Sequence, residues 1–389
     1  MNNFSYSVKS NQDISFEIIQ TDDLFDIKNN TFNDLKKHNF NNRRLVFIDR
    51  NIVEFYFKKI QTYLNHFKYD FHIIQIDSTE LNKNLDTLIF VLKEIEKFGI
   101  LRRSEPIIAI GGGTLLDIIG LASSIYRRGV PYIKIPTTLI GLVDASVGAK
   151  TGINFEVRRN RIGSYYPAFA SILDKKFLST LPDLEISSGM GEIIKISVIK
   201  NKEIYELIKK EGKELIKKKF QNSVNANKII TLSAINMIEE LKDNLWEFNL
   251  KRCVDFGHSF SPIIEMRSLE DSNIKSLTHG QAVSLDVLFS SIISHLRGFL
   301  SKEELNDIFN TINLFGLPTI HESFIDYTNV LESLNDTIKH RNGNQYLPIP
   351  VKIGKYDFIN DLDTNEIREA CNYMVALNKA SLHSKIKIK

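Results

Sequence analysis

Three residues of the types that bind metal ions stand in polar interruptions of otherwise apolar stretches. Glu192 lies in SGMGEIIK, His258 in VDFGHSFSP and His279 in LTHGQAV, each close to a glycine. Two imidazoles and one carboxylate suit a zinc-like ion and leave positions open for substrate oxygens. Taken singly, each residue has a simpler interpretation. Glu192 is spaced to form an ion pair with Lys195, and a lone histidine is more often a packed or capping residue.

A second chemical signal is the glycine triplet at residues 111–113, which follows the apolar run 107–110. A helical pattern begins at Thr114, so the stretch predicts a strand, a glycine turn and a helix. Glycines let backbone N–H groups approach a phosphate closely, and the helix N-terminus adds partial positive charge. The stretch fits neither the G-x-G-x-x-G fingerprint nor the P-loop, and packing alone is the competing explanation.

Basic side chains are frequent around these two signals and suit an anionic substrate. Arginine binds phosphate through two parallel hydrogen bonds, whereas lysine contributes a single concentrated positive charge. A phosphate cradle followed by a polar loop with Asp144, Lys150 and Asn154 indicates a nucleotide site beside a polar substrate site. For any single basic residue, surface solubility is the competing explanation. The residues are Lys150, Arg159, Arg161, Lys195, Lys251, Arg252, Lys339 and Arg341.

The elements that must position these residues change in character along the chain. Strand-like and helical patterns alternate up to about residue 175, which predicts a mostly parallel α/β sheet covered by helices. Asp49, Asp77 and the glycine triplet follow strands, at the edge where such sheets bind ligands. After Pro182 the pattern is helical. We expect an α/β nucleotide-binding domain over residues 1–180 and an all-helical metal- and substrate-binding domain over residues 181–389.

The composition is that of an ordinary globular protein, with 43% hydrophobic and 25% charged residues among 389. A net charge of +3, without basic runs interleaved with aromatic residues, argues against nucleic acid as a partner. The N-terminus has no apolar signal core and no stretch approaches 18 apolar residues, so we expect no membrane partner. Two cysteines, Cys253 and Cys371, fit a reducing compartment, and we expect a cytoplasmic protein.

Several motifs strongly resemble the sugar phosphate cyclases, the family that includes 3-dehydroquinate synthase. The resemblance rests on residues 111–154, on RNRIGSYYP (159–167) and GMGEIIK (189–195), and on VDFGHSFSP (254–262) and LTHGQAV (277–283). It implies a dehydroquinate synthase-like fold, NAD in the α/β half, a bound Zn²⁺ or Co²⁺ ion, a small sugar phosphate as substrate and a homodimer.

Departures from the 3-dehydroquinate synthase pattern indicate a branch of the family. Pro262 stands where those enzymes have a second histidine, and Asp255 where they have asparagine. Gln281 replaces a glutamate, which bears on the partner that orients His279. With LWE (245–247) and KHRNGNQYLPIP (339–350), the chain looks like 2-epi-5-epi-valiolone synthase, which cyclises sedoheptulose 7-phosphate to a C7-cyclitol used in natural product biosynthesis. Demethyl-4-deoxygadusol synthase, 2-epi-valiolone synthase and 3-dehydroquinate synthase are the alternatives within the family.

The resemblance also implies roles for individual residues. It assigns the metal to Glu192, His258 and His279. It assigns NAD to Gly112, Gly113, Asp117, Thr137 and Thr138, with Asp49, Asn51, Glu80 and Lys83 toward the adenosine half. It places Asp144, Lys150, Asn160, Lys195, Arg252 and Asp255 around the sugar as catalytic residues. It assigns specificity to Leu241, Asp255 and His340, and the substrate phosphate to Lys339 and to Arg128 of either subunit.

The reaction of the family follows from the weak acidity of the carbon next to the phosphate-bearing carbon. Transient oxidation of the C5 hydroxyl by NAD acidifies that position, and phosphate leaves by β-elimination. Return of the hydride, ring opening and an intramolecular aldol reaction then close the carbocycle. The resemblance thus implies a lyase that needs no external reductant. A metal-dependent polyol dehydrogenase, which accumulates NADH, and a catalytically silent relative are the alternatives of other classes.

Overall fold

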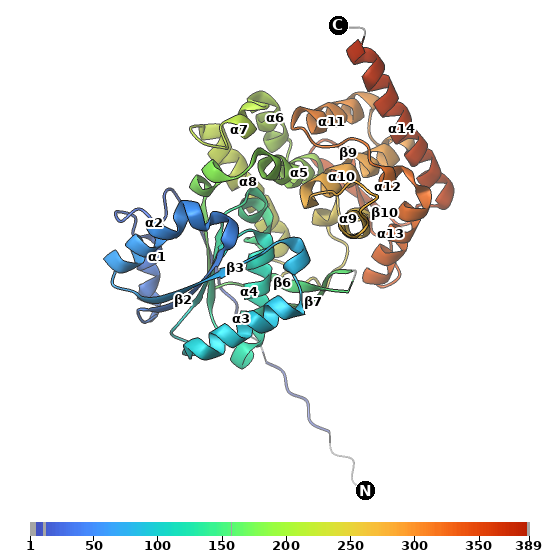
Figure 1. Cartoon of the computed structure of the whole chain (residues 1–389). Coiled ribbons are helices and arrows are strands. Elements are labelled where there is room, and N and C mark those ends of the chain that lie inside the picture. The colour runs from blue at the N-terminus through green and yellow to red at the C-terminus, as the bar shows by residue number, and fades with distance from the viewer. Residues whose placement is uncertain (1–4, 11–12, 157, 387–389) are drawn as a thin grey trace.

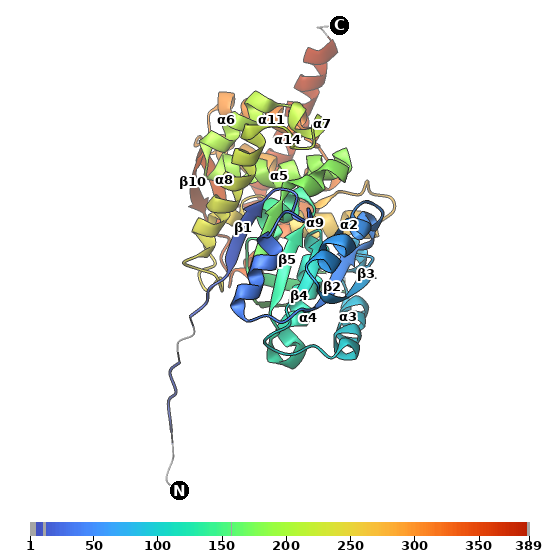
Figure 2. The same cartoon turned by 90° about the vertical axis from the view of Figure 1, so that its left-hand side faces the viewer.

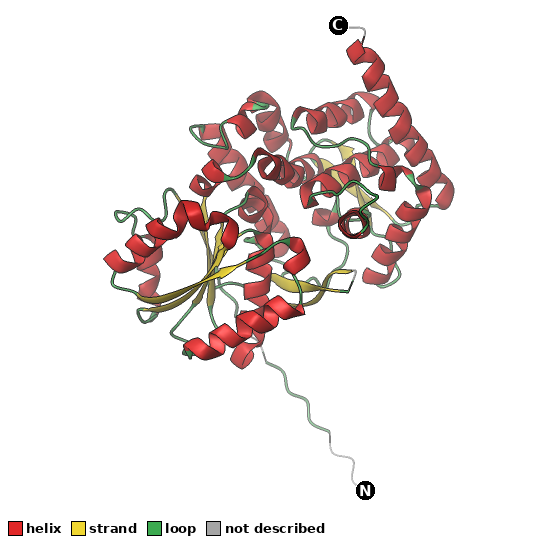
Figure 3. Ribbon diagram, in the orientation of Figure 1, coloured by secondary structure: helices red, strands yellow, loops and turns green. Residues whose placement is uncertain are grey.

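The computed structural model describes residues 5–10, 13–156 and 158–386 of the chain. Its first half contains a six-stranded sheet with helices, and its second half is built mainly of helices (Figures 1 and 3). The predicted α/β half followed by a helical half is therefore confirmed. The domain boundary at residue 180 remains a prediction.

The six strands of the large sheet run parallel in the order β1-β8-β5-β4-β2-β3, which Figure 2 shows nearly face on. Because the strands are parallel, their carboxyl ends lie at one edge, where the glycine turn and Asp49 are found. The strands are β1 (Glu17–Thr21), β2 (Arg43–Asp49), β3 (Asp70–Ile76), β4 (Ile107–Gly111), β5 (Tyr132–Pro136) and β8 (Ala170–Asp174).

Helices cover both faces of this sheet, because successive strand residues point to opposite sides. Leu45 and Phe47 of β2 belong to the same apolar core as α3 (Leu85–Phe98) and α4 (Gly113–Ile125). Val46 and Ile48 belong to the core on the other face, with α2 (Val53–His66) and the short α1 (Thr31–Asp34). Burial on both faces explains the continuous apolar runs by which these strands were predicted.

A two-stranded antiparallel hairpin stands where the sequence analysis expected a polar loop. It consists of β6 (Lys150–Phe155) and β7 (Arg158–Tyr165). The prediction of a loop was wrong from Lys150 to Asn154, because β6 carries a glycine and polar residues in place of the apolar alternation that marks a strand. The hairpin reaches toward the helical half (Figure 1), where Arg161 of β7 forms an ion pair with Asp336.

The second half contains ten α-helices among its described residues. They are α5 (Asp183–Ile199), α6 (Lys202–Glu211), α7 (Glu214–Lys217), α8 (Val224–Leu241), α9 (Ser261–Glu270), α10 (His279–Leu296), α11 (Lys302–Leu314), α12 (Glu322–Ile325), α13 (Tyr327–His340) and α14 (Thr364–Ile386). The expectation of helices alone needs one correction, a hairpin of β9 (Leu347–Lys352) and β10 (Lys355–Ile359). Pro348 and Pro350 exclude a helix at β9 and favour an extended edge.

The apolar core of the helical half continues into the first half. Residues of α5 and α10 form its centre, and Leu139, Leu142 and Val143, which follow β5, belong to the same cluster. The two halves are therefore packed together around the turn that carries Asp144. Within the part of the chain that the structure describes, no helix is both long and apolar enough to cross a membrane.

Candidate active site

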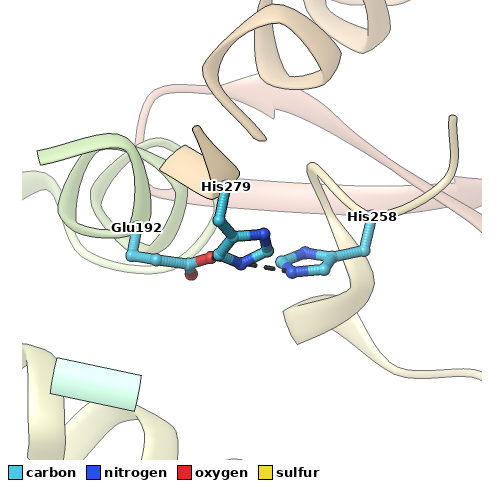
Figure 4. A group of neighbouring side chains, drawn as sticks. All are labelled: Glu192, His258 and His279. Carbon is cyan, nitrogen blue, oxygen red and sulfur yellow. Dashed lines mark ion pairs between the residues drawn. The ribbon is translucent and has the colours of Figure 1, made fainter. Parts of the chain in front are cut away.

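Glu192, His258 and His279 converge on one point although they come from three separate elements. Glu192 Oε1 lies 3.1 Å from His279 Nε2 and 3.6 Å from His258 Nε2. One ligand atom from each residue lies within 4.8 Å of the others, and Figure 4 shows the two rings and the carboxylate pointing toward one another. This arrangement is close enough for all three to contact a single ion.

Two glycines let the helices that carry Glu192 and His279 approach each other. Gly191 precedes Glu192 on α5, and Gly280 follows His279 on α10. A Cβ atom added to Gly280 would lie 1.7 Å from the Ser188 carbonyl oxygen, and one added to Gly191 would lie 2.3 Å from the Gly280 oxygen. Neither contact is possible, so the glycine-to-glycine crossing determines the distance between the two ligands.

His258 is placed by a tight loop between η7 (Cys253–Asp255) and α9. Gly257 adopts a φ of +77°, a left-handed conformation that favours glycine. Beyond His258, the buried Asp286 carboxylate accepts hydrogen bonds from the backbone N–H groups of Phe260 and Ser261. Both sides of the histidine are therefore anchored, and 28% of its side chain remains exposed for a ligand to reach.

The residues of this cluster fit a divalent cation. Glu192 is 2% exposed, and within the described part of the chain its Oε1 makes no hydrogen bond of normal geometry. A buried carboxylate oxygen that only faces two imidazole nitrogens, without a hydrogen bond of good geometry, is costly, and a cation between the three would satisfy it. The other oxygen, Oε2, lies 2.6 Å from Lys195 Nζ, so the ion pair that the spacing suggested is present beside the ligand atom.

The pKa values show how charge is shared among the side chains of this cluster. Burial and the nearby Lys195 lower the pKa of His258 to about 3. Burial and Arg159 act in the same direction on His279, but Glu265 and Glu192 outweigh them and raise its pKa to about 9. Burial and the charge of Glu192 raise the pKa of Asp144. The His258 imidazole is therefore neutral, whereas the carboxylates of Glu265 and Glu192 favour the protonated form of His279.

Glu265 is a functional candidate that the sequence analysis missed. Its Oε2 lies 2.9 Å from His279 Nδ1, and the residue is 2% exposed. Gln281, which was expected to bear on this contact, instead completes a capping box with Thr278 at the start of α10. The available signal was that Glu265 follows His258 closely in HSFSPIIE, as an acidic side chain in an otherwise apolar stretch.

The glycine turn after β4 packs closely against its neighbours. A Cβ added to Gly112 would lie 3.1 Å from Thr138 Cγ2, and one added to Gly113 would lie 3.2 Å from Ala145 Cβ. Gly112 itself caps α4 with ordinary backbone angles, φ −74° and ψ 175°. The glycines therefore serve close approach, and the first N–H groups of α4 face the carboxyl edge of the sheet, where an anion binds well.

The other residues assigned to NAD lie around this turn. Thr137 donates its backbone N–H to the Gly111 oxygen, and the Thr138 hydroxyl accepts from the Gly141 N–H. Asp49 accepts from the Asn51 N–H in η2 (Arg50–Ile52). The carboxylate of Glu80, in η3 (Glu80–Asn82), accepts from Thr114 Oγ1 at 2.9 Å.

The buried Lys83 donates to Asp117 Oδ2 at 2.6 Å and to Asn160 Oδ1 at 2.7 Å. Asn160, expected at the sugar, thus joins the nucleotide group to the hairpin.

A second charged cluster lies around Glu247, which is 6% exposed. Lys150 Nζ lies 2.5 Å from Glu247 Oε1, and Arg252 also pairs with this carboxylate. Arg252 donates to Asp255, and Arg341 Nη2 lies 3.5 Å from the same group. Burial raises the pKa of Asp255, but the two arginines outweigh it and hold the pKa below its usual range. The structure thus brings Lys150, Arg252 and Asp255 together, with Glu247 as a partner that had been noticed only within LWE.

The specificity and phosphate candidates are less tightly grouped. Leu241 ends α8, and its Cδ1 would lie 3.4 Å from a Cβ added to Gly148. Lys339 and His340 are exposed at the end of α13. Arg128 is exposed in η4 (Tyr126–Arg128), just beyond the far end of α4 from the glycine turn. Thirteen helical residues span about 20 Å, so Arg128 lies well away from the turn of its own chain.

Comparison with known proteins identifies the family. The sequence profile of the 3-dehydroquinate synthase N-terminal domain matches residues 73–188, and that of the C-terminal domain matches residues 189–340. A 2-epi-5-epi-valiolone synthase of Streptomyces albus is 42% identical over 343 residues, which are 87% of this chain and 82% of the relative. One from an Actinoplanes species is 38% identical over 373 residues, 94% of this chain and 92% of the relative.

A solved structure agrees with these relatives. The 2-epi-5-epi-valiolone synthase ValA of Streptomyces hygroscopicus subsp. jinggangensis 5008, with NAD⁺ and Zn²⁺ bound, superposes with a TM-score of 0.90 at 37% identity. The match covers 95% of this chain and 99% of that one. With both halves matched in sequence and in structure, this chain belongs to the 3-dehydroquinate synthase family of sugar phosphate cyclases.

Proposed function

We propose that this protein is a sugar phosphate cyclase that converts sedoheptulose 7-phosphate to 2-epi-5-epi-valiolone and releases inorganic phosphate. The observation that carries the proposal is the convergence of Glu192, His258 and His279 beside Lys195, with one buried Glu192 oxygen facing both imidazoles. Relatives that are 37–42% identical along nearly the whole chain bear this activity in their names, which favours this branch over the others. Release of phosphate by elimination makes the enzyme a carbon–oxygen lyase.

Glu192, His258 and His279 would hold the zinc or cobalt ion, with room for substrate oxygens as further ligands. When bound, such an ion polarises the oxygens that it contacts and stabilises negative charge on them.

Gly112, Gly113 and the N-terminus of α4 would hold the NAD pyrophosphate, with Thr137 and Thr138 alongside. When bound, NAD supplies a hydride acceptor that is regenerated within one turnover.

Lys195 and Lys150 would act on the substrate from two directions. Lys195 is 2% exposed, and its ammonium is held by Glu192, so its charge acts across a weakly screened environment. Lys150 is more accessible and is oriented by Glu247. Both ammonium groups stabilise negative charge that develops on substrate oxygens. Arg252 and Asp255, paired with each other, supply fixed hydrogen-bonding groups that orient the sugar hydroxyls.

The substrate phosphate would be held by Lys339 and by Arg128 of the partner subunit in a homodimer. Arg128 supports this arrangement because it is exposed and lies about one helix length from the glycine turn of its own chain. A guanidinium binds phosphate through two parallel hydrogen bonds, and a lysine adds a point charge.

Purified protein incubated with sedoheptulose 7-phosphate, NAD and Zn²⁺ tests the proposal. We expect stoichiometric release of inorganic phosphate without net NADH, and NMR of the product should identify 2-epi-5-epi-valiolone. Net NADH without phosphate would show a polyol dehydrogenase instead. Phosphate release with a different cyclitol in the NMR spectrum would assign the protein to another branch of the family.

A further inference from the structure

The second ring nitrogen of His279 has a partner of its own. While Nε2 faces Glu192, Nδ1 lies 2.9 Å from Glu265 Oε2. A neutral histidine that binds a metal through Nε2 carries its proton on Nδ1, and a carboxylate that accepts this proton fixes the tautomer and the ring orientation. Glu265 is thus placed to orient one metal ligand.

Glu265 is in turn held by a residue from the other half of the molecule. Arg159 lies on β7, and its Nη1 pairs with the same Glu265 oxygen that faces His279. Nη1 also lies 2.6 Å from His279 Nδ1. Both nitrogens are donors when Nδ1 carries the proton, and the Glu265 oxygen that accepts from both offsets their repulsion. With 3% of the Glu265 side chain exposed, solvent cannot replace the arginine as a partner for this charge.

The same guanidinium continues toward the nucleotide side. Arg159 Nε lies 3.4 Å from Glu80 Oε1. The other Glu80 oxygen accepts from Thr114 Oγ1 at 2.9 Å, in the first turn of α4 directly after the glycines. One planar side chain therefore joins two carboxylates, one beside the glycine turn and one beside the metal ligand. A lysine has a single ammonium and cannot reproduce this two-sided contact.

We propose that Arg159 is a positioning residue that links the two halves of the site: it holds Glu265 against His279 and Glu80 against α4. Because Arg159 contacts both carboxylates, zinc affinity should depend on the position of the Glu80 segment beside the N-terminus of α4. The inference takes its metal site from the proposed function. We expect bound NAD to hold the Glu80 segment in place and so to strengthen zinc binding. By the reciprocity of linked binding, zinc should then strengthen NAD binding by the same factor.

The test is the zinc affinity of metal-free protein, measured by competition with a chromophoric chelator, with and without saturating NAD. Glu265→Gln should weaken zinc binding by roughly 10- to 100-fold, the usual effect of losing a carboxylate behind a metal-bound histidine. Arg159→Gln should weaken it about 10-fold and remove the enhancement by NAD. The double variant should bind zinc no more weakly than Glu265→Gln alone, because both changes act through one contact.

Arg161→Gln is the matched control. Arg161 lies on the same strand and also forms an ion pair across the two halves, with Asp336, but it does not touch the metal cluster. Its zinc affinity and NAD enhancement should stay within about twofold of wild type. If Arg159→Gln unfolds, Arg159→Lys keeps the charge and should show an intermediate zinc affinity.

Equal zinc affinities in the Arg159 and Arg161 variants, with and without NAD, would overturn the inference. This outcome is independent of the proposed reaction, because zinc binding is measured without substrate. Conversely, failure to form a cyclitol from sedoheptulose 7-phosphate would overturn the proposed function and leave the zinc measurement standing.

Discussion

The nucleotide side of this site, around the glycine turn, and its metal side, around Glu192, use different kinds of chemical groups. At the glycine turn itself, contacts come from backbone groups and small side chains at the ends of β4 and β5, and charged pairs such as Lys83 with Asp117 lie farther along α4. Around Glu192, contacts come from buried ionisable side chains that are held by one another. The first arrangement follows from one continuous stretch of chain, whereas the second is assembled from three elements far apart in sequence.

This difference determines how each side should respond to change. A buried charge that loses its partner carries an uncompensated desolvation cost, so single substitutions on the metal side should have large effects. A backbone cradle loses little when one small group is added, because its neighbours can shift by a few tenths of an ångström. The predictions below test this contrast, beginning with the largest expected effect.

Removal of one metal ligand should have the largest effect. We expect His258→Ala to abolish bound zinc and to lower turnover by roughly 10³-fold or more, because two remaining ligands hold an ion poorly. Since 28% of the side chain is exposed, the fold should persist. Zinc content by elemental analysis and circular dichroism of the same sample measure both effects.

His295→Ala provides the control, because His295 lies on α10 but contacts the Leu300 oxygen instead of the cluster. It should keep its zinc. Stoichiometric zinc in His258→Ala would mean that the ligand assignment is wrong.

Lys134 of β5 sharpens the comparison, because it is a fully buried charge on the nucleotide side. Its Nζ donates to the Ala145 and Gly148 oxygens, and it forms no ion pair among the described residues. Burial lowers its pKa from 10.5 to about 8, against the opposing charges of Asp117 and Asp144. Between these two values the unfolded chain binds a proton that the folded protein does not.

The free energy of unfolding should therefore rise with pH across this window, by at most about 3 kcal/mol. Lys134→Met should lose this rise, and urea unfolding at the two ends of the window measures it for both proteins. Lys97→Met, at a side chain that is 75% exposed, should keep the wild-type profile. An unchanged pH dependence in Lys134→Met would show that the buried amine does not titrate in this range.

A methyl group at the glycine turn should have the smallest effect. Gly112→Ala places a Cβ 3.1 Å from Thr138 Cγ2, at backbone angles that alanine tolerates. We expect NAD affinity to fall by about tenfold, which corresponds to a small steric cost. Fluorescence titration with NADH measures the loss, and zinc content should stay at the wild-type value. A loss of zinc in this variant would contradict the separation of the two sides.

The sequence allowed the sheet half to be predicted well, because its strands are buried on both faces and read as apolar runs. It failed at β6 of the β6–β7 hairpin, whose glycine and polar residues resemble a loop until the partner strand is seen. The three candidate ligands were found from residue types and motifs. Glu265 and the pairing role of Glu247 were missed because a buried carboxylate cannot be told from an exposed one without its neighbours.

By itself, the sequence determined the order of the elements, the glycine turn, the family resemblance and the types of residue offered for metal, nucleotide and phosphate. Only the tertiary structure decided which charges share a partner, since Arg159, Glu265 and His279 are brought together by a hairpin and two helices. The physical reason is that these two kinds of property depend on the chain over different ranges. Backbone conformation and hydrophobic periodicity are local properties of a chain, whereas the energy of a buried charge depends on neighbours that only folding supplies.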